Sequence, residues 1–169
     1  MLYAAKEAGV TKIVLSENSH KSLFNGCALL GITPLLLPVK TKENIPLPIT
    51  VYELNESLHQ ADALFLTHPD YYGNLLDLEK IKRLCQQEGK LLLIDGAHGS
   101  HLHFDEKIYA GSYADMWVDG VHKSLPALTQ GAVVSSQKPC ADALGKAVDI
   151  FRTTSPSYPI MASVEYAVK

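Results

Sequence analysis

Strand-like and helix-like hydrophobic patterns alternate along the whole chain. Short apolar or β-branched runs predict strands at residues 12–16, 33–39, 61–67, 90–95, 116–121 and 131–135. Apolar residues at helical spacing predict a helix that Ser19 caps and that carries Leu23, Cys27 and Leu30, with further helices at 53–60, 75–88 and 141–151. The segment 40–50 contains two prolines and predicts a surface loop. This alternation indicates an α/β fold: a three-layer α/β/α sandwich with a mainly parallel sheet.

The composition and length of the chain are typical of a single globular domain, which would span residues 1–169. It has 47% hydrophobic and 20% charged residues, with 15 Lys plus Arg against 18 Asp plus Glu and a formal charge of −3. A net charge this small and negative creates no electrostatic field that would attract phosphate backbones or anionic lipids. We therefore expect no nucleic-acid partner. The three cysteines are widely spaced and odd in number, which indicates buried, reduced thiols rather than disulfides.

The hydrophobic stretches are those of a protein outside the membrane. The longest, residues 28–39, is interrupted by glycine and proline, whereas a spanning helix needs about 20 apolar residues. Lys6 and Glu7 stand where a signal peptide would have its apolar segment. We therefore expect a cytoplasmic location.

Polar residues follow three of the predicted strands. They lie at residues 68–73, at residues 95–103, and at His122 with Lys123. Parallel strands bring their carboxyl ends to one edge of the sheet, where ligands bind in such folds. The three groups are therefore expected to converge on one crevice.

Asp95 and Lys123 have the strongest claim to chemistry in this crevice. Asp95 ends a continuously apolar strand, and a carboxylate at the edge of a core needs a cationic partner or a metal. Lys123 is flanked by apolar residues, which would disfavour its ammonium form and favour the free amine needed for imine formation. A structural salt bridge and an ordinary surface lysine are the alternatives that spacing alone leaves open.

His98, His101 and His103 also raise the question of a metal, because imidazole and carboxylate groups bind zinc and iron. The spacing HGSHLH would put these side chains on different faces of a strand. It is not the HExxH pattern of a helical zinc site. We therefore expect no metal site.

Five segments in order resemble the major domain of the ornithine/lysine/arginine decarboxylases, which are pyridoxal-phosphate (PLP) enzymes of the aspartate-aminotransferase fold. They are SENSHKSLFNG (16–26), THPDYYGNLLDLEKI (67–81), LLIDGAHGSHLHF (92–104), DGVHKSLPALTQGA (119–132) and RTTSPSYPIMAS (152–163). The match runs through nearly the whole chain, and HKSLPALTQ is its most specific part. The resemblance implies decarboxylation of lysine, arginine or ornithine to the amine and carbon dioxide, in polyamine biosynthesis.

The resemblance assigns the chemistry to two residues. Lys123 would form the internal aldimine with the cofactor aldehyde, until the substrate amine displaces it. Asp95 would bind the pyridine nitrogen and keep it protonated, which makes the ring an electron sink. Carbon dioxide would leave as electrons flow toward that nitrogen.

The resemblance places four more residues around the cofactor. His20 would stack on one face of the ring, Ala97 would touch the other, and His98 would stand beside it. His122, next to the lysine, would lie near the phosphate or the substrate. With Lys123, the catalytic set that the resemblance implies is His98 and His122.

Several departures from the family pattern accompany the match. The family's phosphate-binding loop and smaller C-terminal domain have no counterpart in the sequence, which therefore resembles a partial domain. Gly120 stands where a serine that contacts phosphate is common, and Gly96 replaces the glutamate of DEAHG. Asp70 stands where threonine is frequent, so a negative charge would lie near the cofactor.

Two other functions stay open at this point. The same fold and cofactor serve aminotransferases and other lyases. A non-catalytic fragment that keeps only the fold is the third hypothesis. The resemblance also implies assembly as a homodimer or higher homo-oligomer, and it leaves the preferred basic amino acid undecided.

Overall fold

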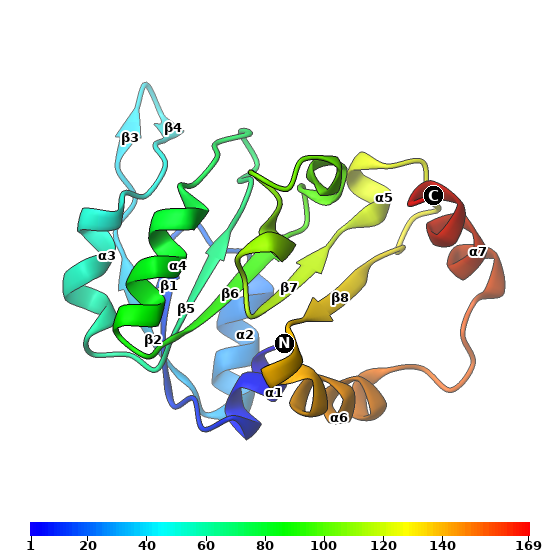
Figure 1. The fold of residues 1–169 in the computed structure, drawn as a ribbon, viewed down its shortest axis with the longest axis horizontal. Coiled ribbons are helices and arrows are strands. Elements are labelled where there is room, and N and C mark those ends of the chain that lie inside the picture. Colours follow the sequence, from blue (N-terminus) through cyan, green and yellow to red (C-terminus); the bar gives the residue numbers. More distant parts are fainter.

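In the computed structural model, residues 1–169 form a six-stranded sheet with helices on both faces (Figure 1). Its strands are β1 (Lys12–Ser16), β2 (Thr33–Leu37), β5 (Ala63–Thr67), β6 (Leu91–Gly96), β7 (Met116–Asp119) and β8 (Val133–Ser136). They lie in the order β2-β1-β5-β6-β7-β8, and only β8 runs antiparallel to its neighbour. The predicted mainly parallel α/β fold is confirmed.

The helices form two layers, one on each face of the sheet. Helices α3 (Val51–Leu58) and α4 (Leu78–Gln87) cover one face, while α1 (Leu2–Glu7), α2 (Lys21–Leu30) and α6 (Ala141–Phe151) cover the other (Figure 1). Two further helices complete the fold. Helix α5 (Val121–Ser124) follows β7, and α7 (Tyr158–Ala167) is the last element of the chain. The three-layer arrangement is therefore as predicted, with α1, α5 and α7 added to the expected helices.

The central strand β6 shows why the layers are stable. Leu92, Leu93 and Ile94 are all fully buried. Leu93 belongs to the core under α1, α2 and α6, whereas Leu92 and Ile94 belong to the core under α3 and α4. Each such side chain contributes about 1.5–3 kcal/mol by leaving water. The continuous apolar run of this strand thus reflects cover on both faces, as predicted.

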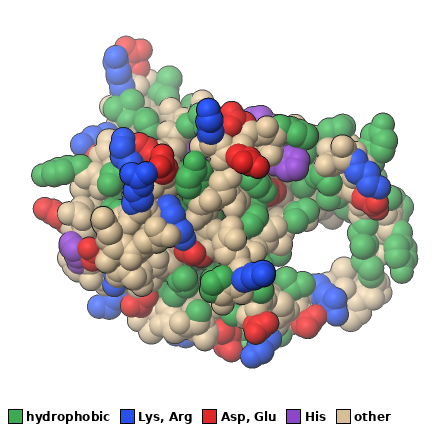
Figure 2. All heavy atoms as spheres, viewed as in Figure 1, with side chains coloured by type: hydrophobic (Ala, Val, Ile, Leu, Met, Phe, Trp, Pro, Cys, Tyr) green, Lys and Arg blue, Asp and Glu red, His purple; other side chains and the backbone are tan.

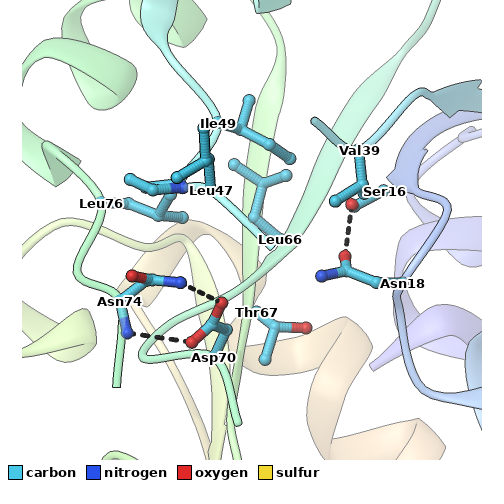
Figure 3. Close-up of a pocket in the computed structure, with 11 residues that line it drawn as sticks. Ser16, Asn18, Val39, Leu47, Ile49, Leu66, Thr67, Asp70, Asn74 and Leu76 are labelled. Carbon is cyan, nitrogen blue, oxygen red and sulfur yellow. Dashed lines mark hydrogen bonds between the residues drawn. The ribbon is translucent and has the colours of Figure 1, made fainter. Parts of the chain in front are cut away.

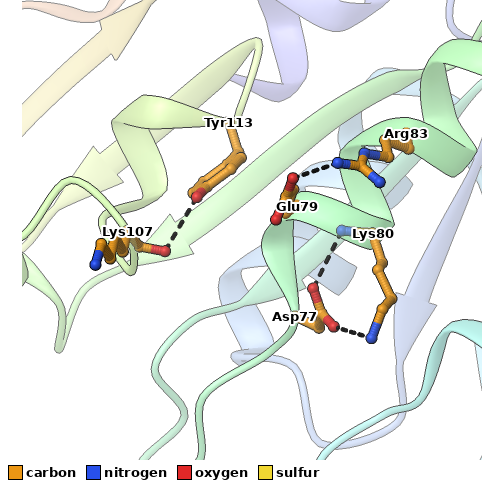
Figure 4. Close-up of polar contacts among 6 residues, drawn as sticks. All are labelled: Asp77, Glu79, Lys80, Arg83, Lys107 and Tyr113. Atoms are coloured by element: carbon orange, nitrogen blue, oxygen red, sulfur yellow. Dashed lines mark hydrogen bonds and ion pairs between the residues drawn. The ribbon is translucent and has the colours of Figure 1, made fainter.

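Three predicted helix starts are wrong. Helix α3 starts at Val51 rather than at Glu53, whose carboxylate accepts a hydrogen bond from the Thr50 amide at 2.8 Å. Side-chain caps also explain the other two starts. His20, not Ser19, caps α2, because its Nδ1 accepts a hydrogen bond from the Ser22 amide at 3.3 Å. Helix α4 starts at Leu78 rather than three residues earlier, since the Asp77 carboxylate accepts from the Lys80 amide at 3.1 Å. Figure 4 shows this cap beside the Glu79–Arg83 ion pair. In both cases a side chain that satisfies a free amide fixes the first turn.

The predicted loop at 40–50 contains a small hairpin. Strands β3 (Thr41–Lys42) and β4 (Ile45–Pro46) pair in antiparallel fashion and project from the body (Figure 1). Glu43 and Asn44 have φ angles of 52° and 66°, as a two-residue hairpin turn of the primed type requires. The prolines obscured this signal.

Helix α7 stands apart from the rest of the fold. None of its residues is buried, and Figure 2 shows an opening between it and the body of the molecule. A hydrogen bond from the Leu128 amide to Ser163 Oγ, at 3.0 Å, connects it to the loop after α5. Tyr158, Met161 and Tyr166 of this helix are exposed, whereas Ile160 and Val164 are partly buried.

The state of the cysteines and the length of the helices match what the sequence predicts. Cys27, Cys85 and Cys140 are buried and unpaired, as predicted. Burial raises the pKa of the Cys85 thiol to about 12, so this group stays protonated at neutral pH. None of the helices combines the length and the apolar character that crossing a membrane requires.

A buried histidine, His68, joins two loops beside the sheet. Its Nε2–H donates to the Ile108 carbonyl at 2.8 Å, and its Nδ1 accepts from the Leu76 amide at 3.0 Å. This pattern requires the neutral ring. Burial lowers the pKa of His68 below its usual 6.5, and the bond to Ile108 opposes that shift only in part.

Acid should therefore weaken the fold through His68. Because its folded pKa is below the unfolded value, the unfolded chain takes up the proton more readily, and stability present above about pH 6.5 is lost as the pH falls further. His68→Gln should cost about 1–3 kcal/mol at pH 7.5. Urea unfolding at pH 7.5 and pH 5 measures both effects. If acidification lowered the free energy of unfolding equally in the native chain and in His68→Gln, this role of His68 would be contradicted.

Candidate active site

The carboxyl ends of β5, β6 and β7 border one large cavity. Strand register brings Thr67 beside Asp95 and Gly96 beside Asp119, so the loops that follow these strands start together. The cavity has a volume of about 1010 Å³, and the sheet face, α2 and α6 form much of its wall. Five of the predicted cofactor-binding residues line it: His20, Asp95, Ala97, His98 and Lys123. The structure therefore brings together most of the predicted set.

Lys123 and His98 are in direct contact in this cavity. Lys123 Nζ lies 3.4 Å from His98 Nε2. The short helix α5 carries the lysine, and the loop after β6 carries the histidine. The Lys123 side chain is exposed, so the expectation that its apolar sequence neighbours strip it of water is wrong. Val121, for example, turns into the core while Lys123 faces the cavity.

The electrostatics of the pair favour a neutral imidazole. Burial lowers the pKa of His98, and the Lys123 ammonium lowers it further, while Asp95 and Asp70 oppose the shift. Its Nδ1 is buried and has no hydrogen-bond partner. A neutral ring can accept a hydrogen bond from the lysine through Nε2, which leaves the Nδ1 position for a proton.

Asp95, the penultimate residue of β6, has one carboxylate oxygen already in a hydrogen bond. Its Oδ1 accepts a hydrogen bond from the Ala97 amide at 3.0 Å, which holds the carboxylate against the start of the loop. The other oxygen makes no hydrogen bond in the structure and the residue lines the cavity. His20 is exposed at the start of α2, where its Nδ1 also lies 2.8 Å from Ser22 Oγ. A carboxylate and an imidazole thus border the cavity near the lysine.

His122 lies apart from the other predicted residues. Its Nδ1–H donates to the Gly131 carbonyl at 2.8 Å, and its backbone amide bonds to the same oxygen at 3.0 Å. It does not line the cavity. The ring therefore holds α5 to the loop before β8.

His101 and His103 lie in a different secondary structure from the strand that was expected. Residues Ser100–Phe104 form a 3-10 helix rather than a strand, and both His101 and His103 are exposed on it. The structure places no group of three His, Cys, Asp or Glu side chains where it could hold a metal ion.

Two glycines allow the loops at the sheet edge to pack closely. A Cβ at Gly120 would lie 2.3 Å from the Ala97 carbonyl oxygen, and one at Gly96 would lie 2.8 Å from the Val118 carbonyl oxygen. Real Cβ atoms do not approach backbone so closely. The two departures from the family pattern are therefore linked to this close packing between the β6 and β7 ends.

A buried polar cluster that the sequence analysis missed lies beside these glycines. Asp119 Oδ2 accepts from the Tyr109 hydroxyl at 2.8 Å and from Trp117 Nε1 at 3.0 Å. Burial raises the pKa of Asp119, and burial together with Asp119 raises the pKa of Tyr109 to about 12. A carboxylate at the end of a short apolar strand was the available signal, since Asp95 shows the same pattern. The cluster holds the end of β7, which leads directly into α5.

Asp70 organises the turn after β5, and Figure 3 shows its contacts with Asn74. Its Oδ1 accepts from the backbone amides of Tyr72 and Asn74, both at 2.9 Å, and its Oδ2 accepts from Asn74 Nδ2 at 2.8 Å. Asp70 lines the large cavity and also a pocket of about 30 Å³ next to it. Asn18 and Thr67 line both as well, so the two spaces adjoin.

The donor set of the cavity fits the ring end of pyridoxal phosphate. An exposed lysine amine suits the aldehyde, and a strand-end carboxylate with a free oxygen suits a protonated ring nitrogen. The orphaned Nδ1 of His98 marks a buried polar atom that the protein alone does not satisfy. Gly120, the N-cap residue of α5, has no side-chain hydroxyl to offer to a phosphate.

Comparison with known proteins finds similarity to one enzyme family along the whole chain. The family model "Orn/Lys/Arg decarboxylase, major domain" matches residues 1–169. The chain is 34% identical to the uncharacterized protein YaaO of Bacillus subtilis over 99% of its own length, and 30% identical to an arginine decarboxylase of Halalkalibacterium halodurans over 94%. It spans only about a third of these relatives, 37% and 34% of their lengths.

Solved structures share the fold. The constitutive lysine decarboxylase of E. coli matches with a TM-score of 0.75 and 24% identity, covering 94% of this chain and 25% of that one. A PLP-bound aminotransferase-like protein from Clostridium difficile matches with a TM-score of 0.69 and 13% identity, covering 93% and 44%. At these identities the likeness shows the fold alone.

Proposed function

Since this chain belongs to the Orn/Lys/Arg decarboxylase family, whose cofactor is pyridoxal phosphate, we propose that it is the cofactor-binding part of a basic amino acid decarboxylase. Its reaction would convert lysine, arginine or ornithine to the corresponding amine and carbon dioxide. The observation that carries the proposal is the contact of Lys123 with His98 in a cavity that Asp95 also borders. Relatives named arginine decarboxylase make arginine the first substrate to test.

When bound, pyridoxal phosphate supplies an aldehyde that condenses with amines and a ring that accepts the electrons released as carbon dioxide leaves. We assign Lys123 Nζ to the aldehyde and the free oxygen of Asp95 to the proton on the ring nitrogen. Neutral His98 accepts a hydrogen bond from Lys123 and so fixes the direction of the amine. The rate advantage from these residues is orientation and electrostatics.

The other predicted residues act at the borders of the site. We assign His20 to one face of the cofactor ring and Ala97 to the other, where its amide also holds Asp95. His122 holds α5, and hence Lys123, through its two bonds to the Gly131 carbonyl. In this assignment His122 is a positioning residue.

The test is product analysis with the purified chain, pyridoxal phosphate and each of the three basic amino acids. We expect release of carbon dioxide in equal amount to the amine, measured by carboxyl-labelled substrate and chromatography. Keto acid without carbon dioxide would instead indicate an aminotransferase of the same fold. Folded protein that binds the cofactor but yields neither product would contradict a catalytic role for this chain.

A further inference from the structure

The cavity contains one carboxylate that the proposed reaction does not use. Asp70 and Asp95 are the only acidic residues among those that line it. Asp95 is committed to the ring nitrogen in the proposal above. A basic amino acid carries a second positive charge at the end of its side chain, and moving that charge out of water is costly unless an anion receives it. Asp70 is the only remaining acidic residue on the cavity wall.

Asp70 is held ready for such a role. Its three hydrogen bonds to Tyr72 and Asn74 fix the carboxylate before any ligand arrives. Figure 3 shows the two that involve Asn74. An ionised carboxylate offers about four acceptor positions, so three donors leave one open on Oδ2. A group fixed in advance loses little freedom when a ligand binds.

Two aromatic rings follow Asp70 on the same turn. Tyr71 and Tyr72 both line the cavity and are 81% and 56% exposed. Their ring centroids are 5.5 Å apart at an interplanar angle of 86°, an edge-to-face arrangement that leaves ring faces open. Aromatic faces attract ammonium and guanidinium groups. One turn therefore presents a carboxylate and two cation-attracting rings.

This turn lies next to the reactive amine. The Tyr71 ring packs edge-to-face on His98 with centroids 5.8 Å apart, and His98 contacts Lys123. The charge of Asp70 also reaches His98, since it raises the pKa of that imidazole. A substrate joined to the cofactor near Lys123 could thus extend past His98 to Asp70.

We propose that Asp70, Tyr71 and Tyr72 form the subsite that receives the cationic end, guanidinium or ammonium, of a basic amino acid. This inference rests on the proposed function, because it assumes that such a substrate enters the cavity.

The test compares pairs of ligands that share a backbone and chain but differ in whether the end of the side chain carries a positive charge. Binding of arginine and of citrulline, its neutral analogue of the same length, is measured by calorimetry on the cofactor-loaded chain, with lysine and norleucine as a second pair. We expect native protein to prefer each cationic ligand by roughly 10-fold or more. Asp70→Asn keeps Oδ1 as an acceptor for two backbone amides but removes the charge, so it should abolish most of this preference while citrulline affinity stays within about 2-fold.

Asp105→Asn is the matched control. Asp105 is exposed, lies outside the cavity, and accepts from the Lys107 amide two residues later at 3.0 Å, as Asp70 does from Tyr72. It should leave the preference unchanged. If Asp70→Asn does not fold, the native chain gives a second measurement: added salt should weaken arginine binding but not citrulline binding.

The outcomes separate the two proposals. Equal loss of arginine and citrulline affinity in Asp70→Asn, or unchanged preference, would overturn the subsite. Amine production together with unchanged preference would overturn the subsite alone. Charge-selective binding that depends on Asp70 but gives no amine would support the subsite and overturn the decarboxylase function.

Discussion

Replacing Lys123 by alanine should give a folded chain that no longer fixes pyridoxal phosphate and no longer turns over. The side chain is exposed and bonds only to His98, so its loss should change the free energy of unfolding by less than about 0.5 kcal/mol. Removal of the group that joins an enzyme covalently to its reactant typically costs roughly 10⁴- to 10⁶-fold in turnover. Any amine production should fall to that extent.

Borohydride reduction followed by peptide mapping measures the effect without relying on turnover. Native chain should retain about one cofactor on the peptide that contains Lys123, and Lys123→Ala should retain only background. Lys123→Arg separates charge from amine chemistry, because guanidinium remains protonated and does not condense with the aldehyde. Cofactor fixed on another lysine in the native chain would contradict the assignment.

Lys107→Ala is the control for non-specific labelling. Its side chain is exposed and outside the cavity, and its contact with the Tyr113 hydroxyl uses the backbone carbonyl at 3.1 Å, which alanine keeps (Figure 4). This variant should fix as much cofactor as the native chain.

Sequence patterns predict the fold well where periodicity and burial agree. The strand Lys12–Ser16 and the helix Ala141–Phe151 have the predicted bounds. The strand has a continuous apolar centre, and the helix repeats apolar residues at helical spacing up to Phe151. The cap of α2 and the start of α4 depend on individual side-chain bonds, which hydrophobic spacing does not report. Helix α7 has no buried residue, so no core-facing stripe defines it.

The sequence predicts where the candidate site lies, at the carboxyl ends of the strands, but not how its side chains are oriented. Strand-end chemistry led to Asp95 and Lys123, and the parallel sheet does bring them to one cavity. The exposure of Lys123 was not predictable, since sequence neighbours on a helix point in different directions. His122 is adjacent to Lys123 in sequence for the same reason, yet it faces Gly131. The hydrogen bonds that fix the Asp70 carboxylate depend on a turn that only the fold reveals.

Replacing Gly120 by serine should destabilise the fold, because a side chain at this position meets the backbone of the neighbouring loop. A Cβ there would lie 2.3 Å from the Ala97 carbonyl oxygen and 3.1 Å from the Ala97 Cα, so the β6 and β7 ends would have to separate. We expect Gly120→Ser to lower the free energy of unfolding by about 2–3 kcal/mol, the cost typical of forcing atoms into a packed interior. For a chain of this length the melting temperature should then fall by roughly 4–12 °C.

The site should be affected together with stability, because Ala97 and Asp95 are joined by a hydrogen bond and Gly120 is the N-cap residue of α5. Gly145→Ser is the matched control: a Cβ at Gly145, within α6, meets no atom inside 4 Å. Helix propensity favours serine over glycine by a few tenths of a kcal/mol, so the control should melt no lower than the native chain. Thermal unfolding and a cofactor titration of both variants measure these effects. A Gly120→Ser variant with native melting temperature and tighter cofactor binding would show instead that the turn yields and that the added hydroxyl reaches the phosphate.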